Sequence, residues 1–174
     1  DVRLTRNLNV AESSIDTDYQ NNDNYLNDDV LLVFKYPGGT QPLLNDLKVF
    51  RSSEMLLIRA EAAADANDFA AAAAFLKELR DARYGAPQAI QSLNTQEDAF
   101  GAILDERRLE LLFEGHRWVD LKRLGSRGNR GIDRDAKESE NLASNISTSD
   151  YRFTLPIPLS ETTANSGVEQ NNGY

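Results

Sequence analysis

Charged side chains at apolar positions of two predicted helices are the feature that most constrains how this chain folds. At about 100° per residue, Arg107 and Glu114 fall within the apolar stripe of one helix, and Glu54 and Glu61 fall within that of another. The stripe around Arg107 comprises Ile103, Leu104 and Leu111, and the stripe around Glu54 comprises Phe50, Leu57 and Ala64. Long charged groups in a core must be paired or must extend their tips to solvent. We therefore predict a structural ion network of these four residues, in which a buried Arg107 bonds Glu61 or Glu54.

Apolar periodicity predicts a helical core at residues 49–125 that begins with a helical hairpin. The first helix starts near Val49, runs about four turns and breaks near Asn67. Asp68 can cap a second, alanine-rich helix, and the short break makes the two helices antiparallel. The hairpin is about one tetratricopeptide unit long, in a family with roughly 34 residues per repeat. It lacks the repeat's tryptophan and proline signatures, so this likeness is architectural.

A third helix is predicted to begin at Thr95, where Asp98 completes a pattern much like a capping box. It runs to about Glu114, and Gly115 interrupts it. A shorter helix then covers residues 116–124. These two helices, residues 95–114 and 116–124, complete the predicted core.

The segments on either side of the core are predicted to be poor in regular structure. Residues 1–48 are rich in Asn and Asp, which favour turns, and the apolar run 30–36 is a possible short strand. Residues 126–174 form a polar loop and an extended segment packed on the same domain, with Ser160 capping a short turn through Ala164. The predicted fold class is therefore mostly α, with tetratricopeptide-like helical hairpins and long irregular loops.

Composition excludes several classes of function. The net charge of −9 disfavours nucleic-acid binding, which usually requires a basic face. The absence of cysteine excludes disulfides, thiol catalysis and thiolate metal sites. No apolar run approaches the length of a membrane span. Because the chain opens with DVRLTRNLNV and no methionine, we expect a fragment whose export signal or lipid anchor would lie upstream.

Metal and cofactor motifs are weak. His116 and Asp120 lie one helical turn apart and could share a metal, but one such pair is more often structural. Asp16 and Asp18 begin a faint calcium-loop pattern that lacks the turn glycine and the closing glutamate. No P-loop or dinucleotide fingerprint is present. We expect no metal and no cofactor.

Catalysis is not expected either. Glu106, Glu110 and Glu114 follow one another at a spacing of four residues. Two carboxylates that flank a cleft can hydrolyse a glycoside. Glutamates at this spacing on a charged helix are more often a solvated face or ion-pair partners. We therefore predict no catalytic residues.

Ligand contacts are sought among the aromatic side chains of the loops. Tyr19 and Tyr25 are the candidates for ligand binding, because a tyrosine ring offers an apolar face and a hydrogen-bonding tip to a sugar. Tyr36 lies in similar sequence, but we expect it to pack the loop onto the helices. Trp118 shares a helical face with Leu121 and is predicted to be core.

Several segments, in order along nearly the whole chain, resemble the SusD/RagB family. The family signature is similar to ERRLELLFEGHRWVDLKRLG, and its R-x-x-E-x-x-L-I-x-A-E-A helix is similar to FRSSEMLLIRAEAAADAND. Its I-R-x-R-A-G segment resembles LKELRDARYG. Its P-I-P-x-x-E and Q-N-P-G-Y ending resembles LPIPLSETTAN and QNNGY, with Asn172 where proline is common. KYPGG and the opening DVR fit as well.

The resemblance implies the C-terminal portion of a longer, mostly helical outer-membrane lipoprotein without enzyme activity. Such a protein would lie on the cell surface, and its only membrane contact would be a lipid anchor absent from this chain. It would bind a nutrient, in the first place an oligosaccharide, and deliver it to a SusC-type TonB-dependent transporter. The alternative is a helical-repeat scaffold that binds other proteins, which a smooth concave helical groove would favour.

Overall fold

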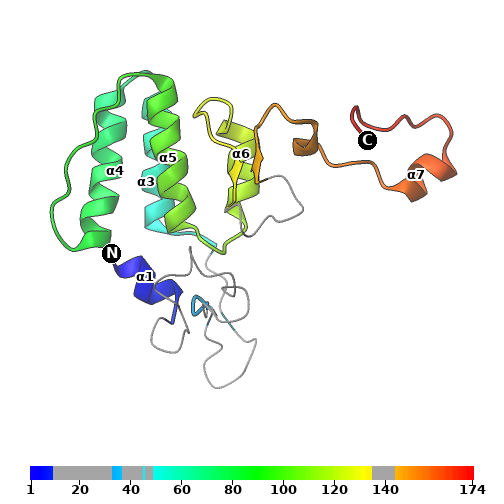
Figure 1. Cartoon of the computed structure of the whole chain (residues 1–174). Coiled ribbons are helices and arrows are strands. Elements are labelled where there is room, and N and C mark those ends of the chain that lie inside the picture. The colour runs from blue at the N-terminus through cyan, green and yellow to red at the C-terminus, as the bar shows by residue number, and fades with distance from the viewer. Residues whose placement is uncertain (10–32, 37–44, 46–48, 135–143) are drawn as a thin grey trace.

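The computed structural model describes residues 1–9, 33–36, 45, 49–134 and 144–174 (Figure 1). The described residues are mainly helical, which confirms the mostly α fold class. The helices are α1 (Val2–Asn7), α3 (Ser52–Asp65), α4 (Phe69–Tyr84), α5 (Gln96–Glu110), α6 (His116–Leu124) and α7 (Leu159–Ala164). Two short antiparallel strands, β1 (Ile132–Asp133) and β2 (Asn145–Ile146), pair Ile132 with Ile146. A 3-10 helix covers Tyr151–Phe153.

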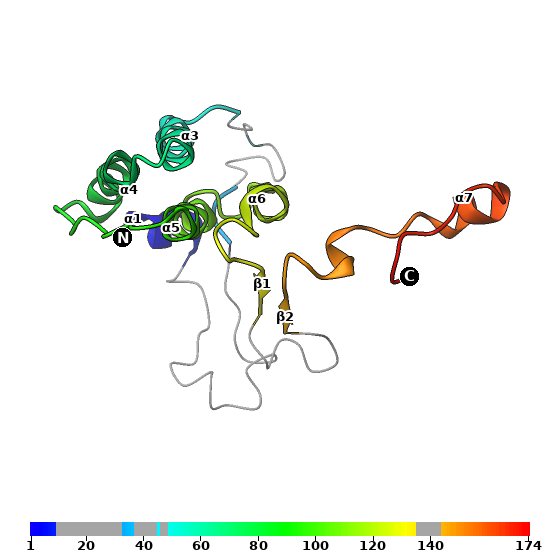
Figure 2. The same ribbon diagram turned by 90° about the horizontal axis from the view of Figure 1, so that it is seen from above.

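Helices α3, α4 and α5 lie side by side, and α6 lies next to α5 on the side away from α4 (Figures 1 and 2). Small side chains allow this close arrangement, since Ala60, Ala64 and Ala72 are completely buried at the centre of the bundle. Larger aliphatic and aromatic side chains surround them, namely Leu57, Leu76, Leu79, Phe100, Ile103 and Leu104. In the described part of the chain, the hydrophobic core therefore runs mainly through α3, α4 and α5.

Side-chain caps fix the ends of these helices where the sequence indicates them. Asp68 accepts a hydrogen bond of 3.0 Å from the Ala71 amide at the start of α4. Thr95 and Asp98 form a complete capping box at the start of α5. Gly85 ends α4 in the left-handed conformation, with φ of 65°, which glycine adopts without steric cost.

Two helix ends differ from the sequence-based expectation. Helix α3 begins at Ser52, so Phe50 lies before it and is 85% exposed instead of heading the buried stripe. Helix α5 ends at Glu110 instead of continuing to Glu114. Turns follow, in which Phe113 and Gly115 have φ of 61° and 79°, outside the right-handed helical region.

The N-terminal segment contains a helix that the loop prediction missed. Asp1 caps α1 by accepting a hydrogen bond from the Arg3 amide. Of the possible strand at 30–36, the structure describes residues 33–36. They form a single bridge between Val33 and Leu8, with the Phe34 amide donating to the Asn7 carbonyl at 2.7 Å.

The C-terminal segment leaves the helical core after Phe153. Phe153 is buried and its ring stacks on Trp118 of α6, with centroids 5.1 Å apart. The residues that follow extend away from the bundle, and α7 contains no buried residue (Figures 1 and 2). In the described chain, the residues after Phe153 therefore lie apart from the helical core. The predicted Ser160 cap is wrong, because Pro158 precedes α7 and Ser160 lies inside it.

A close backbone contact joins α5 to the turn after α6. A Cβ atom at Gly128 would lie 2.7 Å from the Gly101 nitrogen and 2.7 Å from the Phe100 carbonyl carbon. Neither atom belongs to a side chain that can rotate aside. Glycine is therefore required here by the close approach of two backbones.

We expect Gly128→Ala to lower the free energy of unfolding by about 1–3 kcal/mol, since the added methyl group forces α5 and the turn apart. Urea denaturation followed by circular dichroism measures the change. Gly167→Ala is the matched control, because its Cβ would meet only the Asn165 side chain at 3.3 Å. Its effect should stay within about 0.5 kcal/mol. Equal effects of the two substitutions would contradict the close contact.

Candidate functional site

Helices α5 and α6 carry most of the buried charge of the described chain. Glu106, Arg107 and Glu110 on α5 are 1%, 4% and 3% exposed, and Asp120 on α6 is 3% exposed. Burying an ionised group is costly unless a partner compensates it. The ion-pair partners of these buried groups therefore decide whether the groups could act as acids, bases or ligands.

Arg107 lies at the junction of α3, α5 and α6. Its Nε donates to the Asp120 carboxylate of α6 at 2.8 Å. Its two terminal nitrogens lie 3.7 Å from Glu54 and 3.6 Å from Glu61 of α3. The structure therefore brings Arg107 together with both glutamates named from the sequence, while the shortest contact goes to Asp120.

Glu114, the fourth residue assigned to this network, lies elsewhere. Its carboxylate is 2.5 Å from Arg51 and 2.5 Å from Lys35. The cause is the end of α5 at Glu110, which takes Glu114 off the helical face that carries Arg107. Arg123 of α6 instead contacts the Glu61 carboxylate beside Arg107.

A second network surrounds Glu106 and Glu110, on the face of α5 that meets α1 and α4. Arg3 of α1 and Arg80 of α4 bind the two oxygens of Glu106 at 2.5 and 2.6 Å. Arg83 donates two hydrogen bonds to Glu110 at 2.8 and 2.7 Å. Arg51 reaches the same carboxylate at 2.6 Å. Both glutamates are therefore held by guanidinium groups from other segments.

Burial by itself would raise the pKa of Glu110. Hydrogen bonds from Arg83 and Ser53 outweigh it and hold the pKa of this carboxyl below its usual value. A general acid in glycoside hydrolysis needs a raised pKa and access to the substrate. Glu110 has neither property, and Glu106 is as deeply buried. The spacing of these glutamates thus reflects ion pairing.

The metal pair considered from the sequence does not assemble. Asp120 faces Arg107, and the His116 Nδ1 lies 3.9 Å from Glu54 instead. Within the described ranges, no group of three His, Asp or Glu side chains could hold a metal ion. The Asp16 and Asp18 pattern lies outside the described residues.

The aromatic side chains considered from the sequence as ligand contacts or core residues lie in different surroundings. Tyr19 and Tyr25 lie outside the described residues. Tyr36 is 41% exposed, and its hydroxyl donates to the Phe113 carbonyl at 3.3 Å, which ties its segment to the turn after α5. Trp118 is half-buried rather than central, and its core contact is the stacked Phe153.

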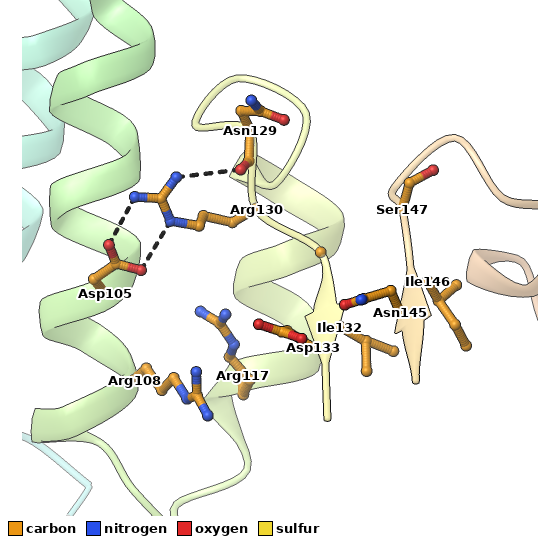
Figure 3. Close-up of a pocket in the computed structure, with 11 residues that line it drawn as sticks. Asp105, Arg108, Arg117, Asn129, Arg130, Ile132, Asp133, Asn145, Ile146 and Ser147 are labelled. Atoms are coloured by element: carbon orange, nitrogen blue, oxygen red, sulfur yellow. Dashed lines mark hydrogen bonds and ion pairs between the residues drawn. The ribbon is translucent and has the colours of Figure 1, made fainter. Parts of the chain in front are cut away.

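A pocket of about 380 Å³ lies between α5, α6 and the β1–β2 hairpin (Figure 3). Arg130 forms one edge, where it donates two hydrogen bonds to Asp105 of α5 at 2.9 and 2.8 Å. Arg108 of α5 and Arg117 of α6 form another. Sequence reasoning missed this pocket, although both arginines belong to the signature stretch and lie off its apolar stripe.

Comparison with known proteins places these features in a family. The SusD family matches residues 6–174 of the chain. Two relatives from Formosa agariphila, SusD-like protein P38 and SusD-like protein P2, are each 36% identical to it, over 90 and 135 residues. The matches cover 47% and 71% of this chain but only 18% and 25% of the relatives, so the chain spans a quarter or less of their length.

Solved structures agree with this match. A crystal structure of a SusD superfamily protein from Bacteroides thetaiotaomicron superposes with a TM-score of 0.58 at 30% identity. The match covers 81% of this chain and 31% of that one. A SusD superfamily protein from Parabacteroides distasonis gives a TM-score of 0.55 at 21% identity, over 83% and 32% of the two chains, and supports the fold alone.

We expect Arg107→Met to lower the free energy of unfolding by roughly 3–5 kcal/mol, because it removes the buried guanidinium that bonds Asp120 and lies against Glu54 and Glu61. Thermal and urea denaturation measure the loss. Arg123→Met is the control, since Arg123 contacts Glu61 and Asp120 from a side chain that is 43% exposed. Its loss should be at most about 1 kcal/mol. A mild effect of Arg107→Met would show that the junction does not depend on this guanidinium.

The lowered pKa of Glu110 predicts a pH dependence of stability. A carboxyl group whose pKa is depressed by folding stabilises the fold above its unfolded pKa, and loses that contribution as the pH falls through its folded pKa. The unfolded reference is 4.5. The difference in unfolding free energy between the wild type and Glu110→Gln should therefore be constant between about pH 6 and 8 and shrink below pH 4.5. Urea titrations at each pH measure it, and a difference that grows on acidification would contradict the assignment.

Proposed function

Because the chain belongs to the SusD family, we propose that it contributes to the non-catalytic capture of a nutrient, in the first place a glycan, at the cell surface. The observation that carries this proposal is the family match over residues 6–174. SusD-like proteins are known for glycan binding in nutrient uptake, and they are generally binding proteins rather than enzymes. They are also typically outer-membrane lipoproteins.

The chemistry of the buried acids supports binding without turnover. The three glutamates that could suggest a glycosidase each contact at least one cationic side chain, and Glu106 and Glu110 are almost inaccessible to solvent. A carboxylate in this state neither donates a proton to a leaving group nor attacks a sugar. Their role in the proposal is structural, as is that of Glu54, Glu61 and Arg107.

The same family membership supports a proposal for the cellular setting. We place the protein on the outer face of the outer membrane, held by a lipid anchor on a preceding segment. Its partner there is a SusC-type TonB-dependent transporter, which receives the captured nutrient. Among the helices of the described part of the chain, none has both the length and the apolar character needed to cross a bilayer.

Calorimetric titration of the purified protein with neutral and acidic oligosaccharides tests the proposal. We expect at least one glycan to bind and to be recovered intact from the mixture by chromatography. The same glycans incubated without protein are the control for recovery. Shorter products that disappear with Glu110→Gln would establish an enzyme instead. Binding of proteins but of no glycan would favour the helical scaffold.

A further inference from the structure

We propose that the pocket between α5, α6 and the β1–β2 hairpin binds an acidic group of the glycan, either the carboxylate of a uronic acid or a sulfate ester (Figure 3). This inference rests on the proposed function and names the class of sugar that this pocket selects. The residues that carry it are Arg108 and Arg117.

Arg108 and Arg117 lack the carboxylate partners that the neighbouring arginines have. Arg107 and Arg130 each bind an aspartate at 2.9 Å or less. Within the described residues, Arg108 forms no ion pair, and Arg117 donates only to the Leu104 carbonyl at 3.2 Å. The chain as a whole has a net charge of −9, so two guanidinium groups without an ion pair form a local excess of positive charge.

The two guanidinium groups also lie close enough to oppose each other. Figure 3 shows them next to one another on the same side of the pocket. Burial lowers the pKa of Arg117 and repulsion from Arg108 lowers it further, while attraction to Asp105 and Asp120 offsets part of this shift. An anion placed against both groups relieves this repulsion and accepts hydrogen bonds from planar donors that match the geometry of a carboxylate or sulfate.

The remaining charges of the pocket leave this preference intact. Arg130 and Asp105 neutralise each other through two hydrogen bonds. Asp133 of β1 is exposed, and Figure 3 shows its carboxylate on the side of β1 that faces Arg117. Among the described residues, the pocket therefore has two guanidinium groups without an ion pair and one such carboxylate. Its positive side is the side formed by α5 and α6.

The other walls suit a sugar better than a free inorganic ion. Ile132 and Ile146 line the pocket on its hairpin side, with side chains that point away from Arg108 and Arg117 (Figure 3). Asn145 and Ser147 provide hydrogen-bonding groups beside it. The volume of about 380 Å³ lies within the range of small-molecule sites, whereas a lone sulfate would fill a small part of it.

Isothermal titration calorimetry at physiological ionic strength tests the proposal with three probes. They are a galacturonate tetramer, a neutral galactose tetramer and sodium sulfate. We expect the galacturonate tetramer to bind most tightly. Arg108→Gln and Arg117→Gln should each weaken it roughly tenfold, because each removes a hydrogen bond between charged groups. The affinity for the neutral tetramer should not change.

Arg59→Gln is the matched control, since Arg59 is an exposed arginine of α3 that lies over the Phe75 ring. It removes the same charge outside the pocket and should leave all affinities within about twofold, because long-range charge effects are screened by salt. Melting curves verify that each variant folds.

Three outcomes would overturn the inference. Sulfate that binds as tightly as the galacturonate tetramer would indicate a simple anion site. Galacturonate binding that is unchanged in both variants would place the acidic sugar elsewhere. Preferential binding of neutral glycans would leave the proposed function standing and this inference wrong, whereas binding of no glycan at all would reject both.

Discussion

The ion pairs of Arg107 are the interaction on which the rest of the bundle depends. The guanidinium is 4% exposed and reaches carboxylates on both neighbouring helices, Asp120 on α6 and the Glu54–Glu61 pair on α3. Apolar side chains tolerate small shifts between helices, but a buried ion pair requires its partners at hydrogen-bonding distance. A slip of either helix along α5 would leave a buried charge unpaired. Arg107 therefore sets the register in which α3, α5 and α6 meet.

Features that depend on neighbouring residues could be predicted from the sequence. The Asp68 cap and the Thr95–Asp98 capping box involve atoms within a few residues of one another, so their patterns are readable without the fold. The burial of Arg107 followed from its position on one helical face. Helix α1 was missed because six residues give little periodicity. The early end of α5 was missed because the apolar pattern continues past Glu110, whereas the backbone turns there.

Contacts between distant segments could not be predicted in the same way. Arg3 binds Glu106 across 103 residues, and neither position identifies the other in a single sequence. The pocket beside Arg117 poses the same problem, since α5, α6 and the paired strands β1 and β2 meet there only in the folded chain. Patterns within one helix thus indicated that charges must be buried. The identity of their partners, and of the charges left without one, required the three-dimensional structure.

The C-terminal segment after Phe153 is held in its conformation by its own hydrogen bonds rather than by the helical core. The Gln170 side chain accepts from the Ile157 amide and donates to its carbonyl, both at 2.8 Å, and the Asn171 amide group donates to the Leu155 carbonyl at 2.7 Å. These bonds fold residues 155–171 back on themselves while Leu155 and Leu159 remain 68% and 79% exposed. A flexible tail of this length would lose much conformational entropy on binding to another surface. A segment that its own hydrogen bonds already restrain loses less, because part of that entropy was lost when the chain folded.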